Sequence, residues 1–128
     1  MKSNSESKIK SYRDLLVWQK AMDLVVASYQ LAKKLPNDEL YCLINQIRRA
    51  AVSVPANIAE GHGRRRLGDY LHHLSIASGS LTELETHLHI AVRLKYLESA
   101  EIESAWDMAM EVGRMLSGLI EKLRQLKT

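Results

Sequence analysis

The stretch Gln46–Gly61, QIRRAAVSVPANIAEG, carries two different patterns at helical spacing. Apolar residues recur mostly three or four positions apart along it and just before it, which is the spacing of one buried helix face. These residues are Leu40, Leu43, Ile44, Ile47, Ala51, Val54 and Ile58. A second row has the same spacing but only polar side chains: Gln46, Arg49, Ser53, Asn57 and Glu60. The stretch therefore predicts one helix with an apolar face and a hydrogen-bonding face.

The polar row has two interpretations from the sequence. With Ser80 and Glu83 from a later helix, it forms either a structural polar network, which we prefer, or a groove for a ligand. An Arg49–Glu83 pair, if buried, would cost about 3 to 5 kcal/mol to break from one side. Pro55 lies within the stretch and has no N–H for the carbonyl of Ala51. We therefore expect the helix to bend or split at Pro55.

The same spacing, followed outward in both directions, predicts four helices and a flexible N-terminal arm. The helices are expected over residues 14–35, 38–61, 67–95 and 99–126, and the arm over residues 1–13. Asp14 is a suitable N-cap for the first helix, Asn37 or Asp38 can cap the second, and Glu98 or Ser99 opens the fourth. No segment shows the sustained alternation of a strand. Because short loops make successive helices antiparallel neighbours, we predict an all-α, up-down-up-down four-helix bundle over residues 14–128.

Length and composition describe a single domain that needs no covalent cross-link. The 128 residues include one cysteine, Cys42, which cannot form an internal disulfide and is expected to be a small core residue. No apolar run reaches the roughly 18 residues that would span a bilayer, and the first residues lack the hydrophobic segment of a signal peptide. We therefore expect a cytoplasmic protein in a reducing compartment, without a membrane partner.

The net charge of +3 is modest, but basic residues gather in particular segments. Arg64, Arg65 and Arg66 follow one another in a glycine-bracketed loop, and Lys8, Lys10 and Arg13 lie near the N-terminus. Guanidinium groups bind phosphates in a bidentate manner, so these residues are candidates for contacts with RNA or DNA. The alternative is a solvated loop without a ligand. No aromatic residue is interleaved with the arginines, which argues against stacking on single strands.

Two features exceed the needs of a single bundle core. The first predicted helix is apolar over more than a third of its circumference, and the fourth carries additional residues beside its main apolar face. The additional residues are Trp106, Met110, Gly113, Ser117 and Ile120. Small residues such as Gly113 and Ser117 favour close contact with another backbone. We interpret them as candidates for an oligomer interface.

Neither a metal site nor a catalytic group is expected. His73 and His87 lie about 21 Å apart along one helix, from the 1.5 Å rise per residue, so they cannot share an ion within one chain. The Glu-x-x-His repeats of a di-iron bundle do not occur. The sequence therefore predicts a protein that is not an enzyme and has no cofactor.

Several motifs resemble those of a known family. QIRRAAVSVPANIAEG, the upstream LLVWQKAMDL and the later LHHLSIASGSLTELETHL look like the 23S rRNA intervening-sequence proteins, over roughly residues 15–126. The resemblance implies a four-helix bundle that assembles into a homopentamer. The family motif falls on Gln46, Arg49, Ser53, Pro55, Asn57, Glu60, Gly61, Ser80 and Glu83, and brings no catalytic role.

The resemblance also bears on function. The family is similar to the accessory protein of diversity-generating retroelements, a basic pentamer that binds a reverse transcriptase and nucleic acid. We therefore expect a nucleic-acid-binding oligomer, with RNA as the preferred ligand. The alternative is a scaffold or adaptor for a polymerase or reverse transcriptase without direct nucleic-acid contact. The acidic residues from Glu98 to Glu111 depart from the basic accessory proteins and argue against binding over the whole surface.

Overall fold

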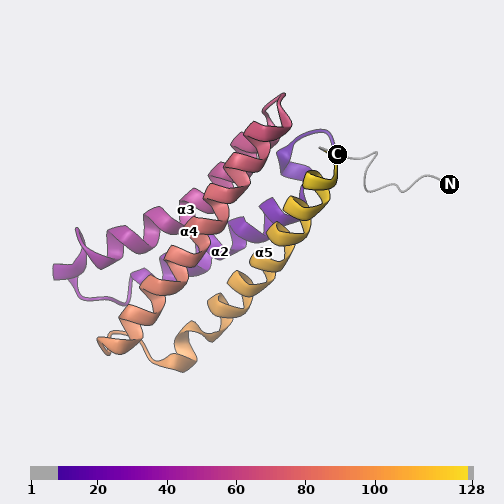
Figure 1. Ribbon diagram of the computed structural model, residues 1–128. Coiled ribbons are helices and arrows are strands. Elements are labelled where there is room, and N and C mark those ends of the chain that lie inside the picture. Colours follow the sequence, from indigo (N-terminus) through magenta and orange to yellow (C-terminus); the bar gives the residue numbers. More distant parts are fainter. Residues whose placement is uncertain (1–8, 127–128) are drawn as a thin grey trace.

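The computed structural model describes residues 9–126, and every regular element in this range is helical. Two short 3-10 helices, η1 and η2, and four α-helices, α2 to α5, make up the fold (Figure 1). Their bounds are η1 Tyr12–Asp14, α2 Leu16–Ala32, η2 Asn37–Glu39, α3 Leu43–His62, α4 Leu67–Arg93 and α5 Ser99–Gln125. The predicted all-α class is confirmed.

The four long helices form an up-down-up-down bundle. Each one packs against the next in the chain, and α5 also packs against α2 (Figure 1). Within residues 9–126, α2 makes no such contact with α4, nor α3 with α5, because these helices occupy opposite corners. The predicted bundle is confirmed, and the topology places the start of α2, the α3–α4 turn and the end of α5 at one end (Figure 1).

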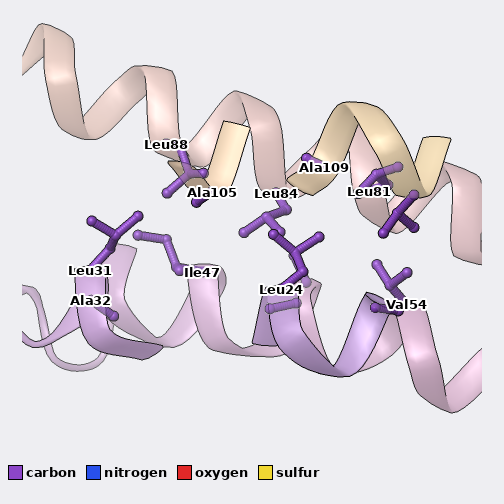
Figure 2. Close-up of a cluster of buried hydrophobic side chains, with 14 of the residues drawn as sticks. Leu24, Leu31, Ala32, Ile47, Val54, Leu81, Leu84, Leu88, Ala105 and Ala109 are labelled. Atoms are coloured by element: carbon purple, nitrogen blue, oxygen red, sulfur yellow. The ribbon is translucent and has the colours of Figure 1, made fainter. Parts of the chain in front are cut away.

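The apolar faces meet in one core, part of which is shown in Figure 2. Leu24 of α2, Ile47 of α3, Leu84 of α4 and Leu116 of α5 are fully buried. Burial of each such side chain contributes about 1.5 to 3 kcal/mol to the stability of the folded state. The helices are amphipathic, and none of those in the described range is long and apolar enough to cross a membrane.

Truncation of Leu84 tests this core. We expect Leu84→Ala to lower the free energy of unfolding by about 2 to 5 kcal/mol, because it removes contacts and leaves a cavity. Urea denaturation followed by circular dichroism measures the change. The control is Thr82→Ala, an exposed position on the same helix, which should change stability by less than about 0.5 kcal/mol. Equal stability of the two variants would contradict the packing described.

The first long helix begins two residues later than predicted, and Asp14 is not its N-cap. Asp14 belongs to η1, where its carboxylate accepts hydrogen bonds from the backbone N–H groups of Lys10 at 2.8 Å and Ser11 at 3.3 Å. Both bonds lower the pKa of Asp14, and the bond from Lys10 has the larger effect. Ser11 caps η1, so regular helical structure begins within the range predicted to be a flexible arm. Residues 1–8 of that range lie outside the residues that the structure describes.

The second long helix begins at Leu43 and not at Asp38. Glu39 explains the difference: its carboxylate accepts from the Leu43 N–H at 3.2 Å and from the Tyr96 hydroxyl at 2.9 Å. These bonds connect η2 to the first residue of α3 and to Tyr96, and the chain between η2 and α3 is a turn. Leu40 and Cys42 are consequently exposed, so their predicted core positions were wrong.

The remaining predicted ends agree with the structure to within three residues. α2 ends at Ala32 and α4 at Arg93, while α5 begins at Ser99 after Glu98 as predicted. Lys95, with φ at 67°, takes the left-handed position that often terminates a helix. Pro55 is buried inside α3, which continues to His62, so the helix is not split there.

Candidate functional site

Ser53 and Asn57 on α3 form a polar network with two residues of α4. The Asn57 amide donates to the hydroxyl of Ser53 at 3.0 Å and to its backbone carbonyl at 2.9 Å. The Ser80 hydroxyl donates to the Ser53 hydroxyl at 2.8 Å, and the His73 ring bonds to the Asn57 side-chain oxygen at 3.0 Å. His73 was not among the residues predicted for this network.

A close contact between α3 and α4 lies beside this network, at Gly61. A Cβ atom there would lie 2.8 Å from the Cβ of His73 and 3.0 Å from the ring of Tyr70. Separations below 3.0 Å are not tolerated without movement of one helix. Gly61 therefore permits the separation at which the Ser53–Ser80 and Asn57–His73 bonds form.

The other members of the polar row lie apart from these hydrogen bonds. Gln46, Arg49 and Glu83 line an α3–α4 hollow of about 300 Å³, together with Ser53 and Ser80. Within residues 9–126, Arg49 and Glu83 form no ion pair; a Glu83 oxygen lies 3.7 Å from the His87 ring instead. Glu60 pairs with Arg64 at 2.7 Å. The structure thus joins Ser53, Asn57 and Ser80, but not the whole predicted set.

Loss of Asn57 tests the hydrogen-bonded part. We expect Asn57→Ala to lower the free energy of unfolding by about 1 to 3 kcal/mol, because Ser53 and His73 lose a half-buried partner. Urea denaturation measures this change. The matched control is Ala56→Gly, an exposed helical neighbour whose expected cost is about 1 kcal/mol from helix propensity alone. A smaller loss for Asn57→Ala than for the control would argue against a stabilising network.

The predicted basic residues gather at one end of the bundle. Arg64, Arg65 and Arg66 lie at the α3–α4 turn, and η1 packs against α3, which brings Lys10 and Arg13 to the same end (Figure 1). Lys122 and Arg124, in the last turn of α5, add to this basic end and were not among the predicted residues. Lys8 lies outside the described range.

These bases differ in their local partners. The Arg64–Glu60 pair partly neutralises the loop, while the Arg13 guanidinium lies 5.7 Å from the centre of the Tyr12 ring. Arg65 and Arg66 are exposed, and no carboxylate within residues 9–126 pairs with them. These two arginines are therefore the most available phosphate ligands of the loop.

The predicted interface residues on α5 divide into two groups. Trp106 is half-buried against the His89 ring, with 4.6 Å between ring centres, and Ile120 packs on the core. Met110, Gly113 and Ser117 line a hollow of about 480 Å³ between α4 and α5. Glu85 also lines it, and burial raises the pKa of this carboxyl.

An exposed apolar stripe on α2 accounts for the excess of apolar residues seen in the first helix. Met22, Val26 and Tyr29 follow helical spacing, and 57% of the Val26 side chain is accessible. The α4–α5 hollow and this α2 stripe lie on different helices, so the chain offers two candidate association surfaces. No group of three or more metal-ligating side chains occurs within the described residues.

Comparison with known proteins identifies the family. The sequence profile of the 23S rRNA-intervening sequence protein family matches residues 13–118. The chain belongs to this family. The resemblance inferred from the QIRRAAVSVPANIAEG motif is therefore confirmed, and the motif residues lie on the α3 and α4 helices of a family member.

A solved structure supports the same assignment. The crystal structure of a protein of unknown function from the S23 ribosomal protein family of Bacteroides thetaiotaomicron superimposes with a TM-score of 0.76 at 27% sequence identity. The alignment covers 82% of this chain and 98% of that chain. Among curated proteins, no significant match is found.

Proposed function

We propose that this family member is a non-enzymatic, self-associating bundle protein that binds nucleic acid, preferentially RNA, through its basic end. The observation that carries the proposal is the arrangement of Arg64–Arg66, Lys10 and Arg13 around one end of the bundle. Residues from two distant parts of the sequence would there contribute to one positive surface. Such surfaces attract the phosphate backbone without reading its sequence.

Self-association strengthens this proposal. A ring, with five subunits expected from the family resemblance, would repeat the basic end around its axis, and a weak contact per chain would become a strong combined one. Exposed apolar side chains on α2 and the α4–α5 hollow support association. They are different surfaces, and a head-to-tail contact between different surfaces closes into a ring when the rotation permits.

Removal of the loop arginines tests nucleic-acid binding. We expect Arg64→Ala/Arg65→Ala/Arg66→Ala to weaken binding of structured RNA and to reduce the salt dependence by roughly one unit of slope per lost phosphate contact. Fluorescence anisotropy over a salt series, with RNA and duplex DNA, measures both. The control, Lys33→Ala/Lys34→Ala/Arg93→Ala, removes three exposed positive charges outside the basic end. Equal losses in the two variants would indicate a general charge effect and contradict the site.

Charge insertion tests self-association. We expect Val26→Glu on α2 and Met110→Glu in the α4–α5 hollow each to dissociate the assembly, because a buried unpaired carboxylate is strongly unfavourable. Light scattering after gel filtration gives the mass. Leu94→Glu, at an equally exposed apolar position at the end of α4, is the control and should keep the wild-type mass. A monomeric wild-type protein would refute the proposal of self-association.

The second candidate function is a protein-interaction scaffold for a polymerase or reverse transcriptase. The exposed α2 stripe favours it, since apolar surface is suited to a protein partner. Such binding depends little on salt, whereas phosphate binding falls steeply. Absence of RNA and DNA binding even at low salt would favour the scaffold.

A further inference from the structure

A hollow on the outer face of α3 combines two arginines with an aromatic wall. Its volume is about 450 Å³. The lining residues are Tyr29 of α2 and Asn45, Arg48, Arg49, Val52 and Ser53 of α3. The lining contains two positive charges and no carboxylate. It lies along the side of the bundle and is distinct from the basic end.

Arg48 is held in place by an aromatic ring. Its guanidinium carbon lies 5.3 Å from the centre of the Tyr29 ring, within the range of a cation–π interaction. The Nε atom is buried and has no hydrogen-bond partner within the described residues. A buried donor without an acceptor is unfavourable, so a bound acceptor would relieve this cost. Arg48 is thus positioned but incompletely satisfied.

Arg49 has an exposed guanidinium that is available for a ligand. Within residues 9–126 it makes no ion pair or hydrogen bond, in contrast to Arg64, which is bound to Glu60. Glu83 shares the neighbouring α3–α4 hollow with Arg49 but approaches His87 instead. Within residues 9–126, Arg49 therefore forms no ion pair with a carboxylate of its own helix or of α4.

Ser53 contributes a donor whose direction is set by the polar network. A hydroxyl has one proton to donate and two positions that accept. The Ser53 oxygen accepts from Ser80 at 2.8 Å and from Asn57 at 3.0 Å, which fills both accepting positions. Its own proton has no acceptor within residues 9–126. The network therefore leaves Ser53 as a donor at the edge of the hollow.

We propose that this hollow binds a phosphate group. Arg48, Arg49, Ser53 and the Asn45 amide supply donors, and phosphate oxygens supply acceptors on several sides. Two guanidinium groups suit a phosphate with several free oxygens better than a carboxylate, which one bidentate arginine can satisfy. The phosphate belongs either to a nucleic-acid backbone or to a small phosphorylated molecule. The proposal does not depend on the basic end.

Calorimetric titration with pyrophosphate and AMP, alongside RNA anisotropy, tests the hollow. We expect Arg49→Gln to weaken binding by about 10- to 100-fold, the loss of one hydrogen bond to a charged group. Arg48→Gln should act similarly. Arg65→Gln/Arg66→Gln is the control for the basic end, and Arg93→Gln is the control for loss of one exposed charge. Thermal unfolding of each variant verifies the fold, and Arg49→Gln decides the test if Arg48→Gln is unstable.

Each outcome has a defined meaning. Loss of pyrophosphate or AMP binding in Arg49→Gln but not in Arg65→Gln/Arg66→Gln supports a site for a small phosphorylated molecule. If the small ligands do not bind, but RNA binding falls further in Arg49→Gln than in Arg93→Gln, the site holds a backbone phosphate. If small-ligand binding is unchanged in Arg49→Gln, or neither RNA nor small ligands distinguish it from Arg93→Gln, the proposal is wrong. If Arg65→Gln/Arg66→Gln binds RNA as the wild-type protein does, the proposal for the basic end is contradicted, and the result for the hollow is unchanged.

Discussion

The close approach of α3 and α4 at Gly61 is the constraint on which the rest of the site depends. With no Cβ at this position, the backbone of α3 reaches the Cβ of His73 and the ring of Tyr70. At this separation the short Ser53–Ser80 bond can form between the two helices. Those side chains in turn set the donor direction of Ser53, which faces two surface hollows. One small residue thus connects helix packing to surface chemistry.

The architecture was predictable because it depends on periodic apolar residues. Leu74, Leu81 and Leu88 of α4 repeat every seven positions, and all three are buried. A repeat of this kind requires a helix with one core face whatever the surrounding chain does. The four helices and their antiparallel order follow from such repeats and short connections. Only the helix ends differed, as at α3.

The differences arise where distant residues decide the local structure. Glu39 of η2 accepts a hydrogen bond from Tyr96, which is 57 positions away in the sequence. His73 joins Asn57 from the neighbouring helix, and Tyr29 holds Arg48 from the preceding one. Helical spacing identifies residues that share a face, but it does not state which side chains meet across two helices. The hydrogen-bonded part of the polar row and the α3 hollow therefore become visible only in the three-dimensional structure.

The distribution of charge along the bundle has a consequence for how the molecule approaches a polyanion. The four helix macrodipoles alternate in direction and largely cancel, so the side chains dominate the long-axis field. Bases outnumber carboxylates at the end that holds Arg65 and Arg66. At the other end the carboxylates are in excess, because five of them, Asp38, Glu39, Glu98, Glu101 and Glu103, lie with four bases, Lys33, Lys34, Arg93 and Lys95. The single chain is therefore an electric dipole, and the field of a polyanion exerts a torque that turns the arginine end forward before any contact is made.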